Sequence, residues 1–481
     1  MVRATLVVFF TVATGLLLLL SPVSAQVVGS GRHHSMLDAT RAKQPLASPS
    51  VFDLECSPAP CVLPNTLVSS DWTNTPVIAV SPIDPAHLLA GAEDLVDCFG
   101  AAAFASGDGG STWNSTCLNS VAAAGDPTLI YGRKSEYVAG TNGVSDNSVV
   151  NIQSSANNGK TWSSISEVVG PLLGDGVPNV PWIQVDNGSG RFANAVYVSV
   201  TQFDSEAVES EISVSHSTTG KGNWITTTVD PVQYKPEVDQ FSRMAIGNDG
   251  TVYLAWQRCA TTGPDENCAD TVADMLFSKS ADGGNSWSAP VKIANVRLVP
   301  DNCRCNFFGN LPNTNEPMSN TPVIAVDNSK GTHSGNLYVV MYDWTGKQMR
   351  VQVVTSTDGG DSWSEPVLVA PPGETHDQFF PAIAVSPSGV VGVSWMDRRN
   401  DPLNVSYQPF AAVSTNGGAS FGKNYVLATN LSDPYLDGSG GTDMGDYTGN
   451  AWAGSTELLV TWPDTRNMQF MQDYVGGLVI K

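Results

Sequence analysis

An eight-residue pattern recurs along this chain and constrains its fold more than any other feature. The pattern has Ser first, Asp or Asn third, Gly fifth, Ser or Thr seventh and an aromatic residue last. Its copies are SGDGGSTW at 106–113, SANNGKTW at 155–162, SADGGNSW at 280–287, STDGGDSW at 356–363 and STNGGASF at 414–421, with a worn copy, STTGKGNW, at 217–224. Successive copies begin 49 to 76 residues apart. A repeat at this spacing indicates an array of similar units.

Each copy predicts a tight hairpin turn. Asp or Asn at the third position accepts hydrogen bonds from turn amides, and the glycines supply positive φ angles. The third-position residues are Asp108, Asn157, Asp282, Asp358 and Asn416. We therefore expect these five side chains to be structural turn residues rather than catalytic ones.

Strand-like segments fill the intervals between the copies. Residues 76–80, 322–326 and 381–385 are near copies of one another, and each precedes a second apolar segment such as 337–341 or 391–395. No long stretch has helical periodicity. Each unit thus consists of two strands followed by a hairpin that carries the pattern. Four antiparallel strands per unit make a β-propeller blade, so the predicted fold class is all-β.

Seven blades are favoured, and six are the alternative. Six units carry the pattern or its remnant, and a seventh begins near Tyr447 with about three strands before Lys481. Residues 50–70 offer a further strand that would complete this last unit and close the ring. We expect a signal peptide at 1–25, a leader with the possible ring-closing strand at 26–69, and one propeller at 70–481.

The pattern matches the Asp-box, or BNR, repeat S-x-D-x-G-x-T-W. On this match the chain resembles the sialidase-like β-propeller proteins from about residue 70 to its end. The resemblance implies that each box lies between the outer two strands of a blade. It also implies that the boxes lie on the face opposite the ligand-binding mouth.

The segments that start the blades, and the loops that join second to third strands, would line this mouth. The blade-starting segments hold Asp239, Asp377 and Tyr447, while two of the loops share a W-x-D-x-R motif at 395–399 and 462–466. Aromatic rings stack on sugars, and carboxylates serve as acid and base. The alternative is structural: in W-x-D-x-R the Asp and Arg would pair at a strand end while the Trp fills the space between blades.

The resemblance implies roles for several of these residues. A sialidase-type site would use Tyr447 as nucleophile and Asp239 or Asp377 as acid/base. Its arginine clamp on the carboxylate of an acidic sugar would come from Arg258, Arg399 and Arg466, with Arg243 and Arg398 in reserve. The family's first-strand motif, Phe/Tyr-Arg-Ile-Pro, is absent, since residues 74–77 are Asn-Thr-Pro-Val. The glutamate partner of Tyr447 has only Glu457 as a weak candidate.

Two functions from different classes follow. The first is a secreted exo-glycosidase of the neuraminidase type. The second is a non-catalytic propeller that binds a glycan or a protein. The expected partner of the enzyme is a glycan or glycoconjugate. The expected partner of the non-catalytic propeller is a glycan, a glycoconjugate or a protein.

The beginning of the chain and its cysteines predict export. Arg3, an apolar stretch at 6–20 and a small-residue cleavage site ending at Ala25 are typical of a secretory signal. An even number of cysteines in an exported chain suggests disulfides. The candidates are Cys56 with Cys61, Cys98 with Cys117, and the group Cys259, Cys268, Cys303 and Cys305, whose pairing the sequence leaves open. Sequons for N-glycosylation lie at Asn114, Asn187, Asn404 and Asn430.

Charge excludes several other classes. The chain has 46 acidic and 24 basic residues and a formal net charge of −22. This balance argues against nucleic acid, and no second apolar run follows the leader to insert into a membrane. With six histidines and no metal-binding motif, we expect no metal and no cofactor, with calcium at the channel mouth as the alternative. The sequence does not indicate an oligomeric state.

Overall fold

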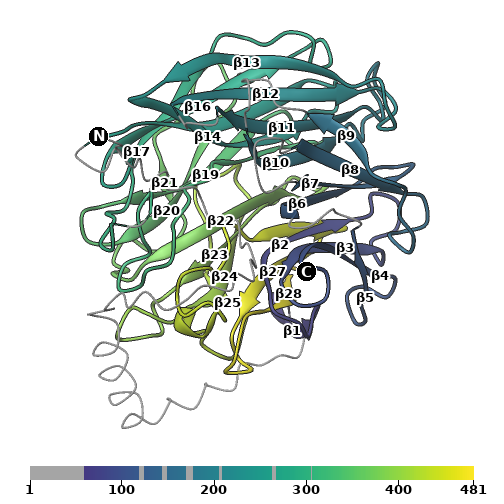
Figure 1. The fold of residues 1–481 in the computed structure, drawn as a ribbon. Coiled ribbons are helices and arrows are strands. Elements are labelled where there is room, and N and C mark those ends of the chain that lie inside the picture. Colours follow the sequence, from purple (N-terminus) through teal and green to yellow (C-terminus); the bar gives the residue numbers. More distant parts are fainter. Residues whose placement is uncertain are drawn as a thin grey trace, which may run out of the picture.

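The computed structural model describes residues 59–118, 124–142, 149–169, 177–204, 208–262, 267–304 and 306–481. Within these ranges the chain forms seven antiparallel sheets of four strands each, and the only helical segment is a short 3₁₀ turn, η1 (Pro434–Leu436). The prediction of a seven-bladed propeller is confirmed (Figure 1). The signal peptide and most of the leader lie outside the described residues.

Six blades are built from consecutive strands. Blade 1 comprises β2 (Thr73–Val80), β3 (Leu88–Asp94), β4 (Gly100–Ser106) and β5 (Asn114–Cys117). Blade 2 comprises β6 (Ala124–Tyr131), β7 (Glu136–Asn142), β8 (Val149–Ser155) and β9 (Ser166–Val169). Blade 3 comprises β10 (Val177–Val185), β11 (Val196–Phe203), β12 (Glu209–Ser217) and β13 (Ile225–Tyr234).

Blade 4 comprises β14 (Glu237–Ile246), β15 (Val252–Ala260), β16 (Val272–Ser280) and β17 (Val291–Arg297). Blade 5 comprises β18 (Val323–Val326), β19 (Leu337–Trp344), β20 (Met349–Ser356) and β21 (Val367–Leu368). Blade 6 comprises β22 (Gln378–Val385), β23 (Val391–Asp397), β24 (Gln408–Ser414) and β25 (Tyr425–Val426).

Blade 7 combines the two ends of the described chain. Its inner strands are β26 (Gly449–Ala453), β27 (Glu457–Asp464) and β28 (Gln472–Val479), and its outermost strand is β1 (Cys61–Leu67). β1 pairs antiparallel with β28, with Cys61 opposite Val479 and Leu67 opposite Tyr474. Residues 50–70 were expected to offer this strand, and β1 closes the ring.

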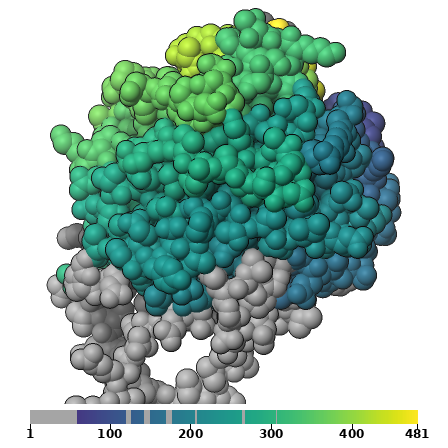
Figure 2. Space-filling view, turned by 90° about the horizontal axis from the view of Figure 1, so that it is seen from above, coloured from purple at the N-terminus to yellow at the C-terminus, as the bar shows by residue number. Residues whose placement is uncertain are grey.

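The first strand of each blade faces the ring axis. These strands contact one another in the closed order β2, β6, β10, β14, β18, β22, β26 and back to β2. Successive blades are therefore neighbours, and the colours follow one another across the surface in the space-filling view (Figure 2). The blades pack through buried apolar side chains, among them the fully buried Trp256, Trp395 and Trp462.

Each eight-residue box joins the third and fourth strands of its blade, as predicted. In the first box the Ser106 hydroxyl donates to Asp108 Oδ1 over 2.8 Å and accepts from the Gly110 amide over 2.9 Å. Asp108 also accepts from the Thr112 side chain and amide, and these bonds lower its pKa to about 2. The same network recurs at 155–161, 280–286, 356–362 and 414–420. The five third-position side chains are thus turn residues.

The boxes also connect neighbouring blades. In blade 4 the Trp287 indole nitrogen donates over 3.0 Å to the hydroxyl of Thr227 in β13, which donates over 2.7 Å to the Gly284 carbonyl. In blade 5 Gly360 packs so closely on Phe277 of β16 that an added Cβ would lie 2.2 Å from the ring. The repeat therefore stabilises the turn and the blade-to-blade contact together.

Two disulfides each join a strand to a loop of the same blade. Cys98 pairs with Cys117, as predicted, and Cys259 pairs with Cys268. Cys61 and Cys303 are disulfide-bonded as well. The remaining candidates, Cys56 and Cys305, lie outside the described residues. No helix of the described chain is long and apolar enough to cross a membrane.

Candidate functional site

The face opposite the boxes gathers the candidate residues. Because the strands of a blade alternate in direction, the beginning of the first strand and the end of the second lie at the same edge. Asp126 lies near the start of β6, Tyr447 directly precedes β26, and Glu93 lies at the end of β3. Arg243 lies in the second half of β14, after the register shift of that strand. These residues come from four blades and share one end of the ring.

Backbone irregularities in the first strands orient these side chains. β2, β6, β10, β14 and β22 each have a register shift. Each shift contains a residue with positive φ, namely Thr75, Asp126, Val180, Phe241 and Phe380. Such a bulge re-aims the side chains that follow it. Trp182 and Arg243 are the first residues to resume pairing after two of the shifts.

An arginine and two aromatic rings meet at the ring axis. The Arg243 guanidinium carbon lies 4.1 Å from the centre of the Trp182 ring and 4.8 Å from that of Tyr447. The two rings meet edge to face at 5.9 Å. The Tyr447 hydroxyl donates to the Pro127 carbonyl over 3.2 Å. Because these residues belong to blades 2, 3, 4 and 7, their contacts span the ring interior.

This central stack is tightly buried. Arg243 is 1% exposed and Tyr447 is 4% exposed. One terminal nitrogen of Arg243 donates to the Ser242 carbonyl over 3.1 Å, and the other has no hydrogen-bond partner among the described residues. Burial lowers the pKa of Arg243 to about 10 and raises that of Tyr447 well above its usual value. The tyrosine is therefore held in its neutral form.

Four carboxyl groups surround the stack. Glu93, Asp126, Asp443 and Asp446 are all partly exposed to solvent. Burial, reinforced by repulsion from the neighbouring acids, raises the pKa of Asp126 to about 7 and that of Asp443 to about 7. Burial raises the pKa of Asp446 to about 6 against the opposing charge of Arg243, and the pKa of Glu93 lies well above its usual value. Protonated and ionised carboxyl groups thus coexist here near neutral pH.

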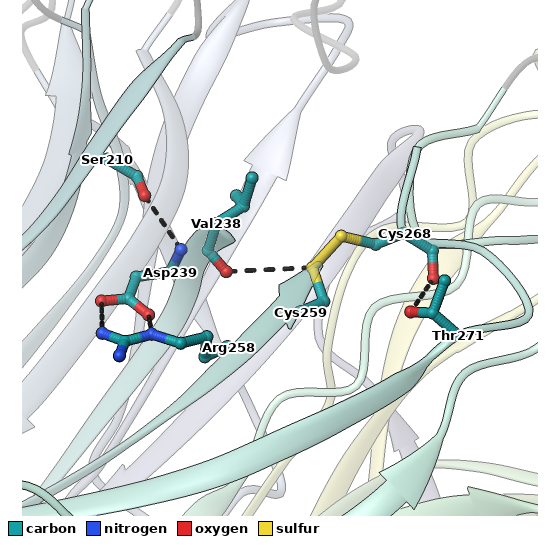
Figure 3. The surroundings of a disulfide bond; sticks show 7 residues. All are labelled: Ser210, Val238, Asp239, Arg258, Cys259, Cys268 and Thr271. Carbon is teal, nitrogen blue, oxygen red and sulfur yellow. Dashed lines mark hydrogen bonds and ion pairs between the residues drawn. A yellow bond between two sulfur atoms is a disulfide. The ribbon is translucent and has the colours of Figure 1, made fainter. Parts of the chain in front are cut away.

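The other predicted residues form separate, closed units. Arg258, near the end of β15, donates to both oxygens of Asp239, at 2.7 and 2.8 Å (Figure 3). It also donates to Asp230. Asp239 is fully buried, and burial raises its pKa to about 7 against the opposing effect of Arg258. Arg258 is therefore bound by the carboxyl groups of Asp239 and Asp230.

The two W-x-D-x-R motifs have the structural arrangement that the sequence left open. The Trp395 indole donates to Asp397 over 2.7 Å, and Arg399 Nε donates to the same carboxylate over 2.9 Å. Trp462, Asp464 and Arg466 repeat this geometry, with both distances at 2.9 Å. Arg399 also stacks on Phe410, and Arg466 on Tyr474. Each arginine charge is matched by the aspartate of its own motif.

Asp377 and Arg398 form a further unit, in which both side chains are fully buried and lie 3.5 Å apart. Asp377 accepts from the Met349 amide and the Asn404 side chain, while Arg398 donates to the carbonyls of Pro312 and Asn404. This network ties blade 6 to blade 5 and to the segment that precedes blade 5.

Of the predicted catalytic and clamp residues, the structure therefore brings Tyr447 and Arg243 together. The charged groups that perturb Tyr447 are Asp126, Arg243, Asp446 and Glu93. Asp239, Asp377 and the remaining arginines are not among them. Glu457 begins β27, at the opposite end of blade 7 from Tyr447.

Sequence reasoning gave no catalytic or binding role to Asp126 or Asp446, and it missed Glu93, Asp443 and Trp182 as members of the site. Each lies near a blade-starting segment or a second-strand end, which was the available signal. Among the described residues, no group of three or more His, Cys, Asp or Glu side chains could hold a metal ion.

No family model matches the chain, and no curated protein matches it. Among solved structures, a protein of unknown function from Dyadobacter fermentans is 13% identical, with a TM-score of 0.46 over 88% of this chain and 100% of that one. A Hadza microbial sialidase is 12% identical, with a TM-score of 0.45 over 81% and 73%.

An α-L-arabinanase from Penicillium chrysogenum, complexed with arabinobiose, is 15% identical, with a TM-score of 0.48 over 74% of this chain and 98% of that one. Sialidases and an arabinanase are thus among the solved structures to which this chain is similar. At these identities and TM-scores the likeness is distant and decides neither a family nor an activity.

Proposed function

We propose that this chain is a glycoside hydrolase whose chemistry is performed by carboxyl groups at the ring axis. The observation that carries the proposal is the group of four carboxyl side chains from blades 1, 2 and 7, around Arg243 and Tyr447, whose pKa values are all raised by burial. Most glycoside hydrolases cleave the glycosidic bond with one carboxyl group that is protonated and another that is ionised.

Asp126 and Asp446 are the best-supported pair for these roles. Burial raises the pKa of both groups, and the charge of Asp446 raises that of Asp126 further, so at mildly acidic pH one proton would be held between them. The protonated member would donate to the oxygen of the leaving sugar. The ionised member would activate water or attack the anomeric carbon.

The substrate best suited to this mouth is a neutral sugar. An acidic sugar would need an arginine clamp to overcome repulsion from the carboxyl groups. Arg258, Arg399 and Arg466 are each already bound by a carboxylate, and the hydroxyl of Tyr447 is bound by a carbonyl. The neuraminidase-type version, with Tyr447 as nucleophile on an acidic sugar, therefore has less support.

We also propose that the protein is secreted and that it acts on an extracellular glycan. The two disulfides with described partners support an oxidising compartment, because such bonds are rare in cytosolic proteins. The predicted signal peptide at 1–25 would direct the chain to export, which is an expectation from the sequence alone.

The test is a panel of fluorogenic glycosides, neutral hexosides and pentosides beside a sialoside, hydrolysed by the purified chain and by a Tyr447→Phe variant. We expect hydrolysis of a neutral member and none of the sialoside. Hydrolysis of the sialoside that Tyr447→Phe abolishes would establish the neuraminidase version instead. Binding to a glycan array with no hydrolysis of any substrate would establish the non-catalytic alternative.

A further inference from the structure

The four N-glycosylation sequons differ in what the asparagine side chain does in the fold. Attachment joins the amide nitrogen to the anomeric carbon of an oligosaccharide carried on a lipid diphosphate. The diphosphate leaves with the electrons of the broken C–O bond, and the amide gives up one proton. The folded protein must then leave room for a sugar at that nitrogen. Contacts at the nitrogen therefore distinguish compatible from incompatible sites.

Asn187 uses its amide to join two blades. It follows β10 in blade 3, and its Nδ2 donates over 2.8 Å to the carbonyl of Tyr131 in blade 2. Its Oδ1 accepts from the Arg133 amide over 3.0 Å, and its backbone carbonyl accepts from Arg133 Nε over 2.7 Å. A sugar on Nδ2 would occupy the space between these two blades.

Asn404 is held even more closely. Its Nδ2 donates over 2.6 Å to Asp377 Oδ2, and its Oδ1 accepts from the Asp377 amide over 3.0 Å. Asp377 is 0% exposed, and the fully buried Arg398 donates to the Asn404 carbonyl. A sugar at this nitrogen would have to enter a buried network, which is costly because polar groups there would lose their partners.

Asn114 and Asn430 have no such contacts. Asn114 is the first residue of β5, the outermost strand of blade 1, and is exposed. Asn430 is exposed in the segment between β25 and η1, where its Oδ1 accepts from the Thr429 hydroxyl over 2.9 Å. No hydrogen bond of either Nδ2 occurs within the described part of the chain, so both nitrogens have room for a glycan.

We propose that the chain, when exported through a eukaryotic secretory pathway, carries N-glycans on Asn114 and Asn430 and carries none on Asn187 or Asn404. The glycan at Asn114 has a structural use. β5 is a short edge strand whose outer side pairs with no other strand of the described chain. A bulky polar group there blocks edge-to-edge pairing between molecules, which is a known liability of exposed strands.

Site-by-site occupancy tests this proposal. The full chain, with its own leader or a host leader in its place, is secreted from a eukaryotic host. Deglycosylation in ¹⁸O-labelled water then marks every formerly occupied asparagine for peptide mass spectrometry. We expect the label at Asn114 and Asn430 and at neither of the other two. Asn430 and Asn404 form a matched pair, because both sequons end in Ser.

Single Asn→Gln variants supply the control. Asn114→Gln and Asn430→Gln should each remove one glycan from the secreted protein, whereas Asn187→Gln and Asn404→Gln should leave the glycan mass unchanged. The label at Asn187 or Asn404 in folded, secreted protein would overturn the proposal. So would bare asparagines at both 114 and 430 while a co-expressed glycoprotein is occupied normally.

Discussion

Asp443 holds its carboxyl group in a place where the charged form is unfavourable, and this makes the stability of the protein depend on pH. Its pKa is raised to about 7 by burial and by the charge of Asp446, against a value of about 4 in an unfolded chain. The folded state therefore binds the extra proton. The stabilisation is fully present below about pH 4 and is lost as the pH rises to about 7.

We predict that the melting temperature falls by a few degrees between pH 4.5 and pH 7.5, since a destabilisation of a few kcal/mol shifts it by roughly 1 °C per kcal/mol in a domain of about 400 residues. Asp443→Asn, which cannot ionise, should flatten this fall. The exposed Glu365→Gln variant serves as control and should keep the slope of the unaltered protein. Differential scanning fluorimetry across this range measures it, and an Asp443→Asn profile with an unchanged slope would refute the assignment.

Arg243 affects the neighbouring carboxyl groups through its charge. Its guanidinium lowers the pKa values of Asp126 and Asp446, whose burial raises them. Arg243→Met keeps an apolar side chain between Trp182 and Tyr447 but removes the charge. The acidic limb of the pH–rate profile should then move up by roughly one unit. An unshifted profile with a uniformly lower rate would show that Arg243 only fills space.

The box hairpin is the repeated element of the fold, and it stabilises both its own turn and the contact between blades. Substitutions at two adjacent glycines distinguish these two contributions. Gly359 and Gly360 both have positive φ, 73° and 93°. A Cβ on Gly359 would approach only the end of the Lys279 side chain at 3.7 Å, whereas on Gly360 it would lie 2.2 Å from Phe277. Overpacking of this kind costs roughly 1–3 kcal/mol beyond the backbone strain.

We therefore predict that Gly360→Ala destabilises the protein by roughly 1–3 kcal/mol more than Gly359→Ala, because only the first disturbs the contact between blades. Chemical denaturation of the two variants measures the difference. Equal losses would mean that the boxes stabilise their own turns and nothing else.

The sequence predicted these elements well because each blade repeats the same local chemistry. A turn made of Ser106, Asp108 and Gly110 depends on neighbours within a few residues, and so does the W-x-D-x-R unit at Asp397. The site is different. Glu93, Trp182 and Tyr447 lie far apart in the chain, and their meeting depends on the number of blades and on bulges that redirect the strands. The sequence pattern alone predicted which face of the ring carries the candidate site, but not which residues meet there.

The same limit applies to the arginines that the sequence suggested for a clamp. Arg399 and Arg466 are suited to a clamp by residue type, yet each is two residues from an aspartate that binds it first. This pairing of Asp and Arg within W-x-D-x-R is the structural alternative that the sequence left undecided. Only side-chain geometry shows that the carboxylate is bound by both its Trp and its Arg.

At the scale of the whole molecule, the ring is closed by hydrogen bonds between β1 and β28. The two strands lie near opposite ends of the described chain, so this pairing holds blade 7 complete. Deletion of residues 61–67 should therefore lower the melting temperature by roughly 5 °C, since several kcal/mol of strand pairing and packing are lost. Calorimetry checks this, and a melting temperature within about 2 °C of the full chain would mean that the ring does not need its closing strand.

The proposed cleavage of a glycosidic bond by carboxyl groups at the ring axis is tested by kcat/KM for Asp126→Asn and Asp446→Asn. The substrate is the neutral glycoside that the unaltered protein hydrolyses fastest. Glu457→Gln, at the opposite end of blade 7, is the matched control. We expect a loss of roughly 10²-fold or more for each aspartate variant, at a melting temperature no lower than that of the unaltered protein, and no loss for the control. Rates within about threefold of the unaltered protein for both aspartate variants would contradict it.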